Sequence, residues 1–134
     1  MSPLSNPLVA KLASWLLSVL RIVTAFLFVE HGTQKWLSFP GARSTATVLW
    51  SLSGAAGLLE LVGGFLLLFG LFTRPVAFVL SGLMAFAYFI AHAPHGFWPI
   101  LNRGELAALY CFVFLYIAAA GGGPWSLDRW LRHR

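Results

Sequence analysis

The stretch that decides the fold reads LSGAAGLLELVGGFLLLFGLF, from Leu52 to Phe72. It runs for 21 residues with Glu60 as its only charge, and a helix that crosses a membrane needs about 20 mostly apolar residues. On a helix, Glu60 shares one face with Gly57 and Gly64, and small residues let helices approach closely in lipid. The stretch therefore predicts a transmembrane helix whose glycine-bearing face points into a bundle.

The whole chain has the composition of a membrane protein. Of its 134 residues, 59% are hydrophobic and 10% are charged, and the mean hydropathy is +0.80, whereas a soluble domain is about 25% charged. Four spans with short connections would use nearly the whole length. We therefore expect a single domain, residues 1–134, folded as an all-α transmembrane four-helix bundle in the lipid bilayer. The expected spans are residues 8–35, 52–72, 75–93 and 105–120.

The charge distribution predicts an orientation and no nucleic-acid partner. The formal charge is +5, but the basic residues are scattered among apolar segments and form no dense block. Four spans place both termini on one side, and the positive-inside rule favours cytoplasmic termini in the plasma (inner) membrane if that side is the more basic. On the side of the termini, the basic residues near helix ends are Lys11, Arg74, Arg129, Arg132 and Arg134. On the opposite side they are Lys35, Arg43 and Arg103.

Cysteine usage and histidine spacing disfavour a cofactor held by this chain alone. Cys111 is the only cysteine, which excludes an intramolecular disulfide, a CxxC redox pair and a cysteine-clustered metal centre. His92 and His95 lie on either side of a proline, and Glu30 and His31 are adjacent on a helix, so that their side chains diverge. We therefore expect no metal site and no haem.

Two charges lie well inside the expected spans. Arg21 falls within the first span and Glu60 within the second. An isolated charge in the membrane is costly, so each needs a partner of opposite charge or a set of hydrogen bonds. We predict that Arg21 and Glu60 form a buried ion pair that fixes the register of the two helices. A role for this pair in ligand binding or proton transfer is the alternative interpretation.

Polar residues gather at the end of the bundle opposite the termini. There the third span aligns Tyr88 with His92, and the fourth aligns Glu105 with Phe112 and Tyr116 at helical spacing. This pattern predicts a cavity with a polar mouth and aromatic walls, although plain core packing would also explain the aromatic stripe. The expected site residues are His31 and Glu105 for proton exchange, and Lys35, Tyr88, His92, Asn102, Phe112 and Tyr116 for ligand contact.

A succession of short motifs resembles the DoxX family of small four-helix membrane proteins. The motifs, in chain order, are Arg21 with HGTQK at 31–35, ELVGG at 60–64, LFGLFTR at 68–74, residues 92–98, NRGE at 102–105 and GPWSLD at 123–128. The family is named after a subunit associated with an archaeal terminal quinol oxidase and thiosulfate:quinone oxidoreductase system. The resemblance implies the four-helix fold and marks Arg21, His31, Lys35, Glu60, Asn102 and Glu105 as positions of interest.

The leading functional hypothesis is a membrane component of a redox system that binds a quinone-like or other small amphipathic molecule between its helices. In this hypothesis His31 or Glu105 exchanges protons, and Lys35 or Asn102 stabilises negative charge on the ligand. Electrons would come from a redox-enzyme partner, so whether this chain is itself catalytic stays open. The alternatives are a structural or assembly subunit, which would include a homo-oligomer, and a small transporter for a weak acid or metabolite.

Overall fold

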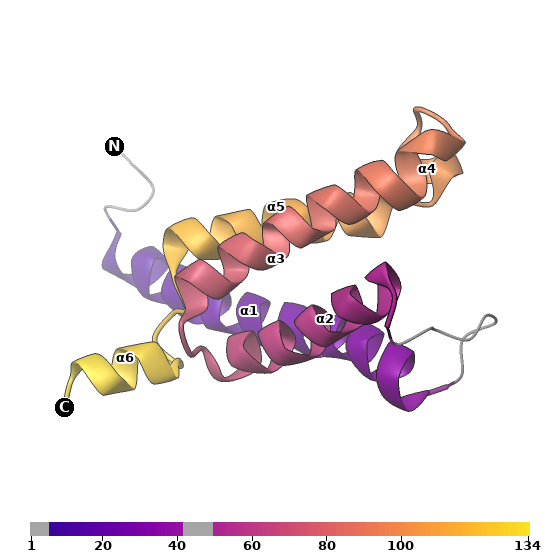
Figure 1. Cartoon of the computed structure of the whole chain (residues 1–134). Coiled ribbons are helices and arrows are strands. Elements are labelled where there is room, and N and C mark those ends of the chain that lie inside the picture. Colours follow the sequence, from indigo (N-terminus) through magenta and orange to yellow (C-terminus); the bar gives the residue numbers. More distant parts are fainter. Residues whose placement is uncertain (1–5, 42–49) are drawn as a thin grey trace.

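The computed structural model describes residues 6–41 and 50–134, and in these residues the fold is entirely helical (Figure 1). The all-α prediction is confirmed. Arg43 and part of the connection between the first two expected spans lie outside the described residues. The long helices are α1 (Pro7–Leu37), α2 (Leu52–Phe69), α3 (Thr73–Ala87) and α5 (Glu105–Ala120), and α4 (Pro99–Asn102) and α6 (Leu127–Arg132) are short.

The first two helices begin and end at recognisable capping residues. The side chain of Asn6 accepts a hydrogen bond from the N–H of Leu8 at the start of α1, and Ser51 does the same for Gly54 at the start of α2. Helix α2 ends at Gly70, whose φ of 69° is the left-handed conformation that glycine tolerates best. The helix is therefore shorter at its C-terminal end than the span expected from hydropathy.

Helix α3 continues beyond Ala87 through a π-helical turn, Tyr88–His92, and a 3₁₀ turn, Ala93–His95. Together they form an apolar rod of 23 residues, and Pro94 lies in its last turn. Helices α1, α2 and this rod are long and apolar enough to cross a membrane, whereas α5 is a shorter apolar helix. The protein is thus a multi-pass membrane protein.

The bundle consists of two helix pairs. Helix α1 packs chiefly on α2, and α3 packs chiefly on α5. Glycines allow the close approach of α1 and α2: a Cβ at Gly64 would lie 2.6 Å from Cγ2 of Val29, and one at Gly32 would lie 2.8 Å from the backbone N of Leu61. The predicted inward glycine face is confirmed. The pairs meet over a core that contains Phe28, Leu67, Leu80, Phe114 and Ile117.

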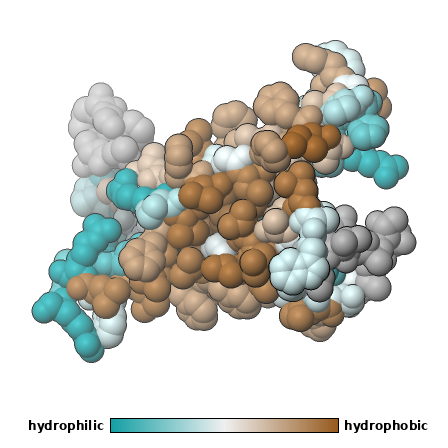
Figure 2. Space-filling view, viewed as in Figure 1, coloured by the Kyte–Doolittle hydropathy of each residue, from teal (hydrophilic) through white to brown (hydrophobic). Residues whose placement is uncertain are grey.

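Both ends of the described chain lie at the same end of the bundle, where α6 packs beside the start of α3, and the two helix pairs diverge towards the other end (Figure 1). A broad apolar belt covers the helices between two hydrophilic ends (Figure 2). Many large hydrophobic side chains in this belt are exposed, as a surface in contact with lipid requires.

Candidate functional site

A cleft of about 740 Å³ opens between the two helix pairs at the end away from the termini. Its walls come from the C-terminal half of α1, the N-terminal half of α2, the end of the α3 rod and the start of α5. Most of the lining is apolar with a few polar groups, which is the usual character of a small-molecule site. The polar lining residues are His31, Gln34, Lys35, Ser53, Glu60, His92, Arg103 and Tyr110.

The centre of this cleft is an ion pair between α1 and α2. Lys35 Nζ lies 2.7 Å from Oε1 of Glu60, and the two side chains are 15% and 5% exposed. The stem of Lys35 passes over Gly57, where an added Cβ would lie 3.0 Å from two carbons of the lysine. The other carboxylate oxygen, Oε2 of Glu60, is buried and has no hydrogen-bond partner among the described residues. One acceptor of a residue that lines the cleft is therefore unsatisfied by the protein, although this oxygen is itself covered by the surrounding side chains.

The predicted pair between Arg21 and Glu60 does not form. Arg21 is fully buried, and its guanidinium donates to four backbone carbonyls instead. These carbonyls belong to Leu67, Leu68, Gly122 and Trp125, at distances of 2.5 to 2.8 Å. The physical reason is that the last carbonyls of a helix lack intrahelical partners, and those of α2 lie about 10 Å along the helix axis from Glu60. Arg21 thus donates hydrogen bonds to the C-terminal carbonyls of α2, and Lys35 forms the ion pair with Glu60.

Two histidines face the cleft in a defined tautomer. Nδ1 of His31 lies 3.0 Å from the carbonyl oxygen of Leu27, and Nδ1 of His92 lies 3.0 Å from that of Asn102. Because a carbonyl only accepts, each Nδ1 carries the proton, and Nε2 of the neutral ring is left as an acceptor. The His31 ring also contacts Tyr110 edge to face, with centroids 5.9 Å apart. Nε2 of His31 is therefore a suitable proton acceptor.

Asn102 and Tyr88 support the rim and do not line the cleft. Asn102 is buried, and its amide donates to the hydroxyl of Tyr88 at 3.2 Å and to the carbonyl of Gly96 at 2.9 Å. Its Oδ1 accepts from the N–H of Gly104 at 2.8 Å. These bonds hold the connection between α3 and α5, which also carries His92. The expected ligand contacts of Tyr88 and Asn102 are replaced by this structural role.

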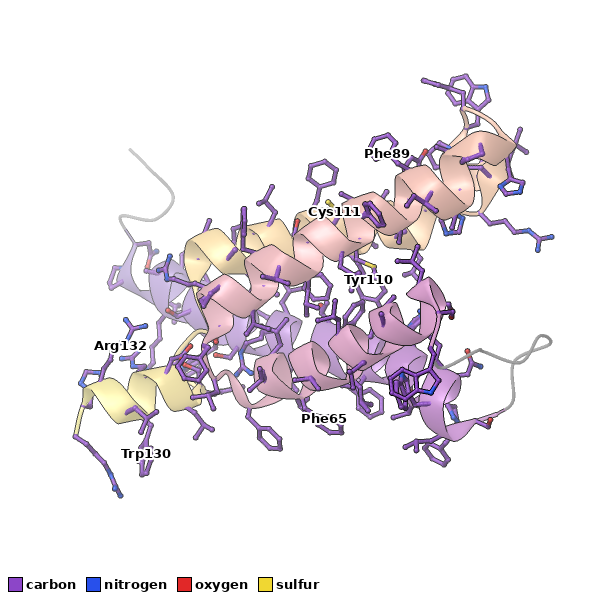
Figure 3. The ribbon with its side chains drawn as sticks, viewed as in Figure 1. Phe65, Phe89, Tyr110, Cys111, Trp130 and Arg132 are labelled. Carbon is purple, nitrogen blue, oxygen red and sulfur yellow. The ribbon has the colours of Figure 1, made fainter. Side chains whose placement is uncertain are left out.

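The stripe expected on the fourth span faces outward. Phe112 and Tyr116 are 69% and 57% exposed, and Glu105 is exposed at the first turn of α5. The inward face carries Tyr110, which points between the helix pairs (Figure 3), and Phe114. Their rings stack on each other, and Phe114 packs edge to face on Phe28. The sequence did not reveal this, because α5 is apolar on all sides and a lipid-facing aromatic stripe has the same spacing as a buried one. Tyr110, Phe28 and Arg103 are cleft residues that were not among the site residues expected from the sequence.

The match to known proteins agrees with this architecture. The family model for DoxX matches residues 16–93, which is more than half of the chain. The chain belongs to the DoxX family. The matched segment contains Arg21 and both members of the Lys35–Glu60 pair.

Two relatives of this DoxX protein come from Haemophilus influenzae, and each bears the description of an uncharacterized protein. The first is 46% identical over 128 residues, which cover 88% of this chain and 92% of the relative. The second is 31% identical over 124 residues, which cover 84% and 80% respectively. No solved structure matches the chain.

The DoxX cleft combines groups that suit a small molecule with both oxygen acceptors and hydroxyl donors. Lys35 and Arg103 offer positive charge, while Glu60 Oε2 and His31 Nε2 can accept hydrogen bonds or protons. Phe28 and Tyr110 supply flat apolar surface beside these groups. Within residues 6–41 and 50–134, no three His, Cys, Asp or Glu side chains are grouped closely enough to hold a metal ion.

Proposed function

We propose that this DoxX protein is the membrane component of a redox system and binds a quinone-like molecule in the cleft between its helix pairs. The cleft opens beside the apolar belt, so a lipid-soluble ring can enter it from the bilayer. Its volume of about 740 Å³ accommodates such a ring, since small-molecule sites usually measure about 300–1,000 Å³. Tyr110 and Phe28 are placed to pack against a planar ligand.

The observation that carries this proposal is the unsatisfied oxygen of Glu60. A buried acceptor without a partner costs about 1–3 kcal/mol, and Oε2 of Glu60 is such an acceptor among the described residues. Because less than 1 Å² of Oε2 is accessible, the side chains that cover it would have to shift before the hydroxyl of a quinol could donate to it and remove this cost. The ion pair with Lys35 holds the carboxylate in place before the ligand arrives.

The polar groups of the cleft also suit the proton chemistry of a quinone. Reduction of a quinone adds two electrons and two protons to its ring oxygens, and oxidation of a quinol releases them. Glu60 and His31 would exchange the protons, because both residues line the cleft and each has an acceptor atom without a partner in the hydrogen bonds described above. The electrons would pass to or from a redox-enzyme partner. Lys35 would stabilise negative charge on a ring oxygen.

Direct binding tests this function. We would titrate the full-length protein in lipid nanodiscs with short-chain ubiquinone and menaquinone analogues and follow binding by calorimetry. We expect saturable binding that weakens about ten-fold or more in Glu60→Gln, because the charged acceptor is lost. His31→Ala should also weaken binding. The matched control is Glu105→Gln, which removes an exposed carboxylate outside the cleft lining and should bind like the unaltered protein.

Two outcomes would contradict the redox function. The first is an absence of saturable binding by the folded protein, which would favour a structural or assembly subunit held together by Arg21 and the glycine face. The second is equal binding by the unaltered protein, His31→Ala and Glu60→Gln. Size-exclusion chromatography and circular dichroism of each variant would show whether the fold is retained.

A further inference from the structure

A second groove, of about 410 Å³, lies at the termini end of the bundle, opposite the cleft. It is bounded by α6, the segment 121–124, the start of α3 and the N-terminal half of α1. Its charge is strongly one-sided, because Asp128 is the only acidic residue that lines it. The basic lining residues are Arg74, Arg129, Arg132 and His133.

The positive charge of this groove is only partly offset by the protein, through the electrostatic attraction between Asp128 and Arg132. Both oxygens of Asp128 are already engaged, since they accept the N–H groups of Phe72 and Thr73 at 2.8 Å each. Arg129 and Arg132 are exposed, and in the part of the chain that the structure describes neither side chain has a hydrogen-bond or salt-bridge partner. Two guanidinium groups are therefore free to bind an anion.

Arg74 adds a fixed positive charge to the same groove. Its Nη1 donates to the carbonyl of Ala119 at 2.5 Å, so it caps the C-terminal end of α5. Gly121 lies against the rest of this guanidinium, because an added Cβ there would be 3.5 Å from Nη2. Arg74 is thus held in place, whereas the two arginines of α6 can adjust to a ligand.

The groove lies at the level where the bundle leaves the lipid. Trp15 and Trp125 stack with ring centroids 6.5 Å apart, and tryptophan is enriched at the membrane–water interface. In α6, Arg132 and Trp130 project from opposite sides (Figure 3), and Trp130 and Leu131 are half exposed. This short helix has the amphipathic character of a segment that lies in the interface.

We propose that this groove binds the phosphate of an anionic phospholipid headgroup from the leaflet on the termini side. Guanidinium groups bind phosphate oxygens through paired N–H donors, and Arg74, Arg129 and Arg132 surround one concave site. The flanking tryptophans and apolar side chains would contact the glycerol and acyl chains of a lipid, which a soluble phosphate compound lacks. This site is independent of the quinone proposal, since it shares no residue with the cleft.

Lipid retention measured by native mass spectrometry tests the proposal. The full-length protein in detergent would be titrated separately with phosphatidylglycerol and with phosphatidylcholine. We expect saturable, selective retention of phosphatidylglycerol that weakens as the ionic strength rises. The double variant Arg129→Gln/Arg132→Gln should lose about ten- to thirty-fold in affinity, because each cation near an anionic lipid contributes about five-fold.

The matched control is Arg134→Gln. Arg134 lies near the same helix but stacks over the ring of Trp130 at 4.0 Å and does not line the groove. Its removal should change phosphatidylglycerol affinity by less than two-fold. Equal retention of the two lipids, or an equal loss in Arg134→Gln and the double variant, would overturn the proposal.

Inorganic phosphate distinguishes the source of the anion. If the groove is a lipid site, millimolar phosphate at constant ionic strength leaves phosphatidylglycerol retention unchanged. If phosphate displaces the lipid and raises the melting temperature as much as the lipid does, the groove takes a soluble phosphate compound, and the lipid assignment is wrong.

Discussion

At the scale of single residues, each buried charge of this DoxX protein has a partner of a different kind. Arg21 is satisfied by backbone carbonyls from α2 and from the segment after α5. Glu60 is satisfied on one oxygen by Lys35. Because the partners are separate, the two sites should respond to substitution independently, although both lie on the α1–α2 interface.

Double-mutant cycles test this separation. Removing Lys35 leaves the carboxylate of Glu60 buried and unpaired, so we expect Lys35→Met to lower the free energy of unfolding by about 3 kcal/mol. Glu60→Gln leaves only the partly exposed Lys35 unpaired and should lower it by less. The double variant should lose less than the sum, with a coupling energy of about 1–3 kcal/mol. The measurement is a denaturant titration in mild detergent followed by tryptophan fluorescence.

The control cycle combines Glu60→Gln with Arg21→Met. Their effects should add, because Arg21 donates to carbonyls and makes no contact with Glu60. A large coupling energy in this second cycle, or an additive result in the first, would show that the assignment of partners is wrong.

The sequence predicted that these charges are buried and need partners, but it did not predict the partners. Charge and hydropathy identify Arg21 and Glu60 as costly residues in lipid. They do not show that α2 ends at Gly70 and leaves carbonyls for Arg21, or that Gly57 leaves a path for Lys35. Both features depend on backbone geometry at a particular crossing of two helices.

At the scale of elements, α6 is attached to the bundle by Asp128. Its carboxylate accepts the N–H groups of Phe72 and Thr73 at the start of α3, and the N–H of Asp128 donates to the carbonyl of Gly70. Partial burial alone would raise the pKa of Asp128, but the hydrogen bonds from Thr73 and Phe72 and the charge of Arg132 outweigh it and hold the pKa below its ordinary value.

This attachment should weaken in acid. A carboxyl group whose pKa is lower in the folded than in the unfolded chain stabilises the folded state. This stabilisation is fully present at a pH above the pKa of an aspartate in the unfolded chain, about 3.9, and is lost as the pH falls through the pKa of the folded state. We expect the melting temperature of the unaltered protein to fall towards that of Asp128→Asn between pH 5 and pH 3. The variant should be the less stable of the two at pH 7, because an amide offers one acceptor where the carboxylate offers two.

The control for this pH dependence is Glu105→Gln, which removes an exposed carboxylate elsewhere and should keep the acid response of the unaltered protein. If Asp128→Asn and the unaltered protein differ by the same amount at pH 7 and pH 3, Asp128 does not stabilise the fold through its charge.

The inward face of a helix could be predicted from the sequence where small and polar residues marked that face. The inward face of α2 carries Gly57 and Gly64 beside Glu60, and these residues are buried as expected. Helix α5 has no such contrast, so its orientation could not be read from spacing. Helix α6 is only six residues long and is capped locally by Ser126. Its place in the bundle depends on Asp128, whose tertiary contacts no local pattern reveals.

At the scale of the whole molecule, the two proposed sites lie at opposite ends of an apolar belt (Figure 2). The helix pairs are held closely at the termini end by Arg21 and by the contact of α6 with α3. They diverge at the other end, where the cleft opens. The same arrangement that keeps the bundle together at one surface therefore creates space for a ligand at the other.

The orientation of this bundle in the membrane is a prediction for the whole molecule. The termini end carries Lys11, Arg74 and the arginines of α6, so the positive-inside rule places it in the cytoplasm and the cleft on the outer side. Single cysteines would be introduced at His95 and at Arg134 in a Cys111→Ala background and treated with a membrane-impermeant maleimide on intact cells. We expect His95→Cys to be labelled on intact cells and Arg134→Cys only after the membrane is permeabilised. Labelling of Arg134→Cys on intact cells would reverse the orientation and place the basic groove in the outer leaflet, whereas labelling of neither cysteine before permeabilisation would contradict an outward-facing cleft.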